Sequence, residues 1–243
     1  MSFKIIKLRK SHERFNSRRE WLKSMHTFSF AQYSDSDWDN FGKIRVINED
    51  IISPNAGFSR HSHSNMEIVT IVIKGEITHR DSLNNLGVIQ ENEVQVMSAG
   101  TGISHSEKNE ENQECKLFQV WIYPNVQDLK PSYNQISIKN TYGNNLIIDS
   151  SRKNSGALFI NQDISIWRCK YNPLIKKSLP SEIKKFNWIQ VIEGDLLVRD
   201  KNNKLIKMLS NGDGLGFEIS DFSDINIQSD NMVDILLFSM PKI

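Results

Sequence analysis

The 243-residue sequence contains only two cysteines, Cys115 and Cys169. Two cysteines are too few for a disulfide framework. Neither belongs to a Cys-x-x-Cys pair, which excludes a thiolate metal site of the usual spacing. We therefore expect both thiols to be buried as small hydrophobic groups.

Long apolar stretches are also absent. A membrane-spanning helix needs roughly 18 consecutive apolar residues, and the longest apolar stretches here, residues 68–73 and 233–238, have the length of strands. The N-terminal segment is basic but has no apolar region of the kind found in a secretory signal. We therefore expect a cytoplasmic protein with no membrane partner.

The chain has no excess of either charge, because 30 Lys and Arg side chains face 29 Asp and Glu side chains. The net charge of +1 gives no general attraction to nucleic acid, so direct nucleic-acid binding is not expected. Residues 1–24 form a local basic patch, which we interpret as a solvated edge of the fold.

Helix signals are scarce, and short β-branched stretches alternate with turn residues. Residues 66–73 are rich in Val and Ile and end at Lys74-Gly75, and Asn84-Asn85 and Gly100-Thr101-Gly102 are further turn signals. Many short strands at near-regular spacing predict an all-β sandwich or barrel with few short helices.

The chain contains an internal repeat. A shift of 119 residues superposes eight identical residues over residues 72–92 without a gap. The identical pairs are Val72/Val191, Ile73/Ile192, Gly75/Gly194, Arg80/Arg199, Asp81/Asp200, Asn84/Asn203, Leu86/Leu205 and Asn92/Asn211. The repeat predicts two β units of about 120 residues each, joined near residues 124–131.

Two pairs of polar residues have the spacing of metal ligands on strands. Residues i and i+2 of a strand point to the same face, so His61 projects with His63 and His105 projects with Glu107. Two such pairs on neighbouring strands can converge on one ion. Imidazole nitrogens with one carboxylate oxygen suit Fe, Zn, Ni, Cu or Mn, and do not suit Mg or Ca.

The repeat supplies an internal comparison for these candidate ligands. The 119-residue shift places Pro180, Glu182, Asp224 and Asn226 opposite His61, His63, His105 and Glu107. The fold signature is thus present in both halves, whereas the candidate ligands occur only in the first. This pattern indicates one active unit and one degenerate unit.

The residues around these histidines resemble the two cupin motifs. Gly57, the His-x-His pair and Glu67 resemble the first motif, which ends at Gly75, and Gly102, His105 and Asn109 resemble the second. Three further stretches are similar to the pirin family: residues 26–30 (HTFSF), 45–50 (RVINED) and 97–103 (MSAGTGI). The resemblance is strong over residues 20–125 and looser beyond them, where it rests on the two-unit arrangement.

The resemblance implies an all-β bicupin, that is, two tandem cupin-type β-barrels of the double-stranded β-helix type. Residues 1–124 would form an N-terminal metal-binding barrel, and residues 132–243 a degenerate barrel without metal ligands. The family pattern implies one divalent transition metal ion (Fe, Ni, Mn, Co, Cu or Zn), held by His61, His63, His105 and Glu107. Many cupins use a glutamate at the place of Glu67, which is therefore an alternative ligand or a group that orients a ligating histidine.

Bacterial pirins of this layout are quercetinase-like. The resemblance thus implies a dioxygenase that cleaves the heterocycle of a flavonol such as quercetin with O₂ and releases CO, with Glu107 as the catalytic base. One alternative is a metal- or redox-sensing regulatory cupin without turnover, and another is an enzyme for a different phenol or enediol. We expect a monomer.

The remaining aromatic residues carry weaker signals. We expect His79 to be a core or rim residue, His26 to pack in the first barrel, and Trp121 to be core. Substrate contacts are not readable from the sequence beyond an apolar cavity, for which the lining candidates are Phe58, Met97, Phe118 and Val120.

Overall fold

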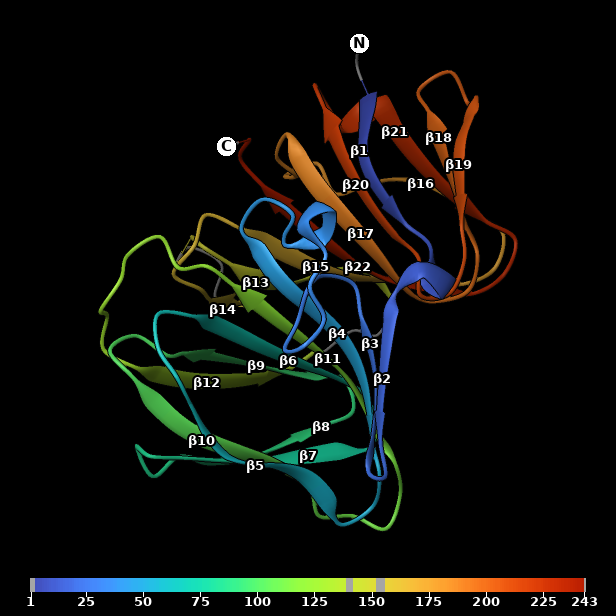
Figure 1. The fold of residues 1–243 in the computed structure, drawn as a ribbon. Helices are drawn as coiled ribbons and strands as arrows, with labels where there is room; N and C mark the ends of the chain where they lie inside the picture. Colours follow the sequence, from blue (N-terminus) through green and yellow to red (C-terminus); the bar gives the residue numbers. More distant parts are fainter. Residues whose placement is uncertain (1–2, 139–141, 152–155, 243) are drawn as a thin grey trace. The chain divides into compact units, whose positions relative to one another are not determined.

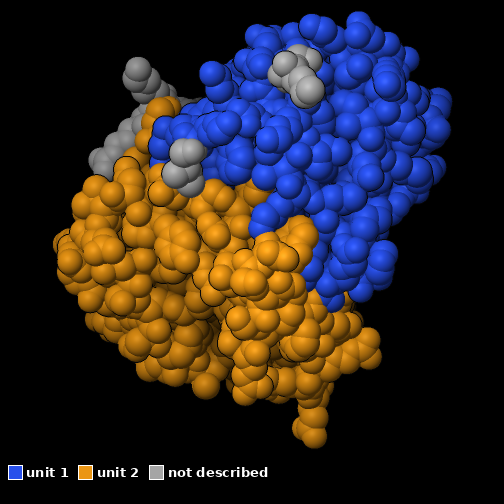
Figure 2. All heavy atoms as spheres, turned by 45° about the horizontal axis from the view of Figure 1, so that its top comes forward, with its two compact units in different colours: residues 1–14, 140–149, 163–243 blue, residues 15–139, 150–162 orange. Residues whose placement is uncertain are grey.

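The chain folds into two compact units in the computed structural model, which describes residues 3–138, 142–151 and 156–242. The N-terminal unit comprises residues 15–139 and 150–162, coloured orange in Figure 2. The C-terminal unit, coloured blue, comprises residues 1–14, 140–149 and 163–243.

The N-terminal unit consists of two antiparallel sheets (Figure 1). Its strands are β2 (Phe15–Arg19), β3 (Leu22–His26), β4 (Ile44–Ile52), β5 (Ala56–His63), β6 (Glu67–Lys74), β7 (Glu76–Asp81), β8 (Leu86–Gln90), β9 (Glu93–Ser98), β10 (Ile103–Asn109), β11 (Cys115–Ile122) and β12 (Ser132–Ser137). The larger sheet has the order β12-β9-β6-β11-β4-β3-β2, and the smaller has the order β5-β10-β7-β8. The short strand β14 (Leu158–Phe159) contacts β9 and β12.

The interior of this unit has an apolar cluster on each side of a polar layer. One cluster contains Val72, Ile77 and Leu117, and the other contains Ile68 and Met97. Residues 68, 70 and 72 of β6 share one face because side chains alternate along a strand. The buried residue 70 is a threonine, so a polar group lies between the two clusters at the level of the candidate site.

The C-terminal unit repeats the two-sheet plan (Figure 1). Its strands are β1 (Phe3–Arg9), β13 (Gly143–Asp149), β15 (Ser165–Tyr171), β16 (Ile175–Ser178), β17 (Phe186–Glu193), β18 (Leu196–Asp200), β19 (Leu205–Leu209), β20 (Gly214–Ile219), β21 (Ile225–Ser229) and β22 (Val233–Met240). One sheet contains the order β1-β20-β17-β22-β15-β13, and the other has the order β16-β21-β18-β19.

The N-terminal strand belongs to the C-terminal unit, and here the structure differs from the expected boundaries of 1–124 and 132–243. Strand β1 pairs with β20, from Phe3 opposite Ile219 to Arg9 opposite Gly214. The buried carboxylate of Asp213 accepts hydrogen bonds from the Lys10 ammonium and the Ser11 amide. These contacts join segments about 200 residues apart in the chain, which no local sequence pattern reveals. The basic segment at the start of the chain is thus partly an edge strand.

The expected all-β class with few short helices is confirmed. The helices among the described residues are three 3₁₀ turns, η1 (Ser11–Glu13), η2 (Ser36–Trp38) and η3 (Phe222–Asp224). Within the described part of the chain, no helix is long and apolar enough to cross a membrane. Each unit is a sandwich of two open sheets and not a closed barrel, since strands such as β2, β8 and β19 end their sheets with one neighbour.

Strand pairing shows which residues of the two units correspond. Asp81 and Asp200, which match under the 119-residue shift, pair with His105 and Ile225 respectively. The counterpart of His105 is therefore Ile225 and not Asp224, so the uniform shift is wrong by one residue in this strand. The same register matches Glu107 with Ile227, not Asn226, and His79 with Val198. The three counterparts in the C-terminal unit are all fully buried apolar side chains.

Candidate metal centre

Three histidines of the N-terminal unit converge on one point. Strands β5 and β10 pair with His61 directly opposite His105, and His63 lies two residues further along β5 on the same face. One ring nitrogen from each histidine lies within 4.8 Å of those of the other two. The ring centroids of His61 and His105 are 4.5 Å apart, and those of His63 and His105 are 5.0 Å apart.

Hydrogen bonds at the outer ring nitrogens orient two of these imidazoles. His61 Nδ1 lies 2.8 Å from the carbonyl oxygen of Ser59 and therefore donates its proton there. His105 Nδ1 lies 3.4 Å from Nδ1 of His79. His105 Nε2 is buried and has no hydrogen-bond partner. A buried nitrogen without a partner is costly, and a metal ion is the kind of ligand that would satisfy it.

The charge state of the histidines also fits a metal site. Burial, with the neighbouring His105 and His61, lowers the pKa of His63 to about 4. Burial, with His61 and His79, lowers the pKa of His105 to about 3. Both rings are therefore neutral at pH 7, the form in which imidazole presents a lone pair to a metal.

The Glu107 carboxylate is buried next to His105 and is held by the facing sheet. Thr70 Oγ1 donates to Glu107 Oε1 at 3.0 Å, and Gln119 Nε2 donates to Oε2 at 2.6 Å. The register of the pairing between β10 and β5 shifts between His105 and Glu107. Glu107 forms a second group of potential ligands with His79 and His105, again within 4.8 Å. The structure thus brings the three histidines together and places Glu107 beside one of them.

Glu67 lies elsewhere in the unit. Its buried carboxylate accepts hydrogen bonds from Ser98 Oγ at 2.6 Å and from the backbone amide of Asn161 at 3.2 Å. Neither group of potential ligands found among the described residues contains Glu67. Glu67 therefore ties segment 156–162 to β6 and β9.

Other residues near the site were missed or misplaced by the sequence patterns. Trp121, expected as core, lies edge-on to His63 with the ring centroids 4.9 Å apart. Gln95, to which no role was given, is fully buried, and neither its amide oxygen nor its amide nitrogen has a hydrogen-bond partner. Two of the expected lining residues, Phe118 and Val120, lie on the opposite face of β11 from Gln119, because strand neighbours alternate.

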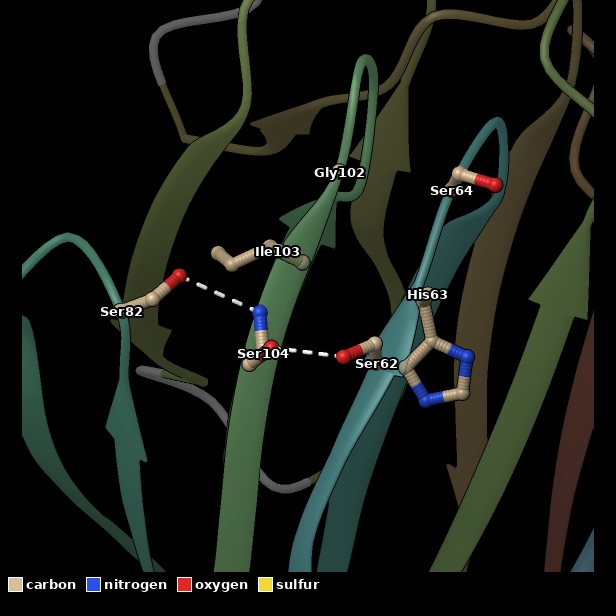
Figure 3. Close-up of a pocket in the computed structure, with 7 residues that line it drawn as sticks. All are labelled: Ser62, His63, Ser64, Ser82, Gly102, Ile103 and Ser104. Carbon is tan, nitrogen blue, oxygen red and sulfur yellow. Dashed lines mark hydrogen bonds between the residues drawn. The ribbon is translucent and has the colours of Figure 1, made fainter.

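A pocket of about 340 Å³ lies at the end of β5 and β10, beside His63. Its other lining residues are Ser62, Ser64, Ser82, Gly102, Ile103 and Ser104. Figure 3 shows hydrogen bonds that connect three of these serines across neighbouring strands, with the His63 ring pointing away from them. The hydroxyls of Ser62, Ser82 and Ser104 therefore face away from the His63 ring.

Two tandem cupin-type units, one of which carries a cluster of two half-buried histidines and one buried histidine, define the class of bicupin proteins with a candidate metal centre. Residues 7–122 match the Pirin family, and residues 147–240 match the quercetinase C-terminal cupin domain. The chain is 35% identical over 240 residues to quercetin 2,3-dioxygenase of Escherichia coli K12, covering 98% of this chain and 100% of that protein.

Two solved structures show the same relationship. The E. coli protein YhhW has a TM-score of 0.89 at 34% identity, with 98% of each chain covered. A structure described as the bacterial pirin YhhW in complex with nickel(II) has a TM-score of 0.87 at 34% identity, covering 98% of this chain and 99% of that chain. The present chain belongs to the pirin family.

Proposed function

We propose that this protein is a metal-dependent dioxygenase that cleaves the heterocycle of a flavonol such as quercetin with O₂ and releases CO. One divalent transition metal ion would be held by His61, His63, His105 and Glu107. The observation that carries the proposal is the buried, unpartnered Nε2 of His105, which lies in a cluster with the imidazoles of His61 and His63. The names of the whole-length relative and of the nickel-bound structural neighbour support it.

The ion would supply a Lewis acid that lowers the pKa of a phenolic hydroxyl bound to it. Its identity stays open, since three imidazoles and a carboxylate suit several first-row metals. Nickel is the first ion to test because a structural neighbour is described with it.

Glu107 is the residue that would accept the proton of the flavonol 3-hydroxyl. The hydrogen bonds from Thr70 and Gln119 fix the direction of its carboxylate, and burial keeps it out of bulk water. The proton moves from the hydroxyl oxygen to a carboxylate oxygen, which leaves an electron-rich flavonolate. That anion is the species expected to react with O₂, because its ring carries the extra electron density.

The inner face of the larger sheet would hold the rest of the flavonol. Ile68 and Met97 are apolar there, and Trp121 packs against that cluster. Gln95 shares this face, since it pairs with Thr70 in the sheet register. Its unpartnered amide offers both a donor and an acceptor, which matches a ligand that carries a hydroxyl and a keto group side by side.

The test measures oxygen consumption and loss of flavonol absorbance with protein loaded separately with Fe(II), Ni(II), Mn(II), Co(II), Cu(II) or Zn(II). We expect turnover with at least one ion and none in His61→Ala. Glu107→Gln should lose turnover, whereas Glu67→Gln, a matched change at a buried carboxylate away from the cluster, should keep most of it. One tightly bound metal per chain without turnover for any ion would refute the dioxygenase and favour a metal-sensing regulatory protein.

A further inference from the structure

A chain of hydrogen bonds leads from the candidate metal centre to a buried aspartate. His105 Nδ1 lies 3.4 Å from Nδ1 of His79, and Nε2 of His79 lies 3.2 Å from Oδ2 of Asp81. The side chains of His79 and Asp81 are fully buried. His79 also belongs to the second group of potential ligands, but in the function proposed above neither residue holds the metal or takes part in the reaction.

These hydrogen bonds permit one arrangement of protons in which His105 can act as a metal ligand. A carboxylate only accepts hydrogen bonds, so His79 Nε2 carries a proton and donates it to Asp81. In this arrangement His79 has no second proton, so its Nδ1 has a lone pair and accepts from His105 Nδ1. His105 Nε2 is then unprotonated, and it is the buried nitrogen without a partner.

We propose that Asp81 and His79 are positioning residues that fix the tautomer of His105, so that its Nε2 lone pair faces the metal site. The inference rests on the metal centre of the proposed function and does not depend on the flavonol or on O₂. It also gives Asp81 a role beyond the turn that follows β7.

The turn itself fixes which oxygen of Asp81 faces the histidine. Asp81 Oδ1 accepts hydrogen bonds from the backbone amides of Leu83 at 2.9 Å and Asn85 at 3.0 Å. Oδ2 is thereby left for His79 and for the side-chain amide of Asn85. The carboxylate cannot rotate without breaking the turn, so it acts as a fixed acceptor for His79.

The C-terminal unit contains the same aspartate turn but has no histidine pair beside it. Asp200 accepts from the backbone amides of Asn202 at 2.9 Å and Lys204 at 2.8 Å, at the same spacing as in the first unit. The counterparts of His79 and His105 are the buried Val198 and Ile225. An aspartate is therefore sufficient to build the turn, and the two histidines are additions found only beside the candidate metal centre.

Asp81→Asn provides a sharp test, because it should reverse the direction of donation in both hydrogen bonds that link His105, His79 and residue 81. The two backbone amides require an oxygen on the turn side, so the amide nitrogen of Asn faces His79 Nε2 and donates to it, and the side-chain amide of Asn85, which donates to Oδ2 in the wild type, must turn its oxygen toward this nitrogen. His79 must then carry its proton on Nδ1 and donate to His105, whose own proton moves to Nε2. A protonated Nε2 cannot bind a metal.

The experiment measures the tautomer of His105 in metal-free protein by ¹⁵N NMR and the affinity for Ni²⁺ by equilibrium dialysis. We expect unprotonated Nε2 in the wild type, protonated Nε2 in Asp81→Asn, and a loss of Ni²⁺ affinity of at least about tenfold. Asp200→Asn is the matched control and should leave both readings unchanged.

Changes at His79 give a second, independent measurement if Asp81→Asn does not fold. The amide of His79→Gln can accept from His105 and donate to Asp81, so this variant should keep much of the Ni²⁺ affinity. His79→Leu can do neither and should lose about as much affinity as Asp81→Asn.

Unchanged His105 tautomer and Ni²⁺ affinity in Asp81→Asn would overturn the inference, as would equal losses in Asp81→Asn and Asp200→Asn. Failure of flavonol turnover alone would refute the proposed reaction and leave these measurements intact. If the wild type bound no Ni²⁺ or other transition metal ion, the metal centre and this positioning role would both be wrong.

Discussion

The low pKa values at the histidine cluster predict a specific loss of stability in mild acid. In metal-free protein the pKa of His105 is about 3, whereas an unfolded histidine titrates near 6.5. At pH values between these two pKa values, the histidine binds a proton in the unfolded chain but not in the folded chain. Unfolding is therefore favoured as the pH falls through this window, and the full contribution to stability is present only above about pH 6.5.

The expected size follows from the two pKa values. For a single histidine with these constants, lowering the pH from 7 to 5 reduces the free energy of unfolding by about 2 kcal/mol. The replacement that removes this contribution is His105→Ile, because Ile225 fills the corresponding place in the C-terminal unit without strain on the fold. The variant leaves Nδ1 of His79 without its partner at both pH values, so this cost cancels in the comparison.

The assay is urea unfolding at pH 7 and pH 5 in the presence of a chelator. Wild-type protein should lose about 2 kcal/mol more between the two pH values than His105→Ile does. His63, whose pKa is lowered mainly by burial, contributes to both losses, but it contributes less in His105→Ile because His105 is one of the causes that lower its pKa, so the difference between the two proteins is at least about 2 kcal/mol. Equal losses in the two proteins would show that His105 is protonated as readily in the folded chain as in the unfolded one, which would refute the reasoning.

Three further predictions concern the groups around the cluster. A Cβ at Gly57 would lie 2.3 Å from the backbone oxygen of Glu107, so Gly57→Ala should cost about 1–3 kcal/mol in urea unfolding and weaken Ni²⁺ binding; unchanged binding would contradict it. Gln119→Leu removes the donor to Glu107 Oε2 and should lower Ni²⁺ affinity by about tenfold or more in dialysis, and full affinity would show that this bond is dispensable. Burial raises the pKa of Cys115 and Cys169 to about 12, so neither thiol should react with a disulfide reagent at pH 8 until urea unfolds the chain; rapid reaction of the native protein would contradict this.

The part of the site that could be predicted depends on spacing within a strand. His61 and His63 had to share a face, as did His105 and Glu107, because side chains alternate along a strand. The structure adds the pairing that brings His61 opposite His105. The same alternation, applied to β11, would have placed Phe118 and Val120 on the face away from Gln119.

The remaining features depend on contacts between segments that are distant in the sequence. Thr70 and Gln119 hold Glu107 from the facing sheet, and no periodicity reveals which residues of two facing sheets meet. The placement of β1 in the C-terminal unit is of the same kind. His79 had a visible signal, since it lies two residues before Asp81 and occurs in only one copy of the repeat, but its contact with His105 requires the β7–β10 register.

The C-terminal unit shows that this scaffold does not need polar side chains at these positions. Val198, Ile225 and Ile227 fill the places of His79, His105 and Glu107 and are fully buried. Burying polar groups is costly unless they are partnered, so the fold alone gives no reason for a histidine with a free buried nitrogen. The strands therefore do not depend on the metal, and chelation should remove only the stabilisation that comes from ligand binding. Circular dichroism of the chelated protein should still show the native β signal, whereas unfolding on chelation would make the metal part of the scaffold.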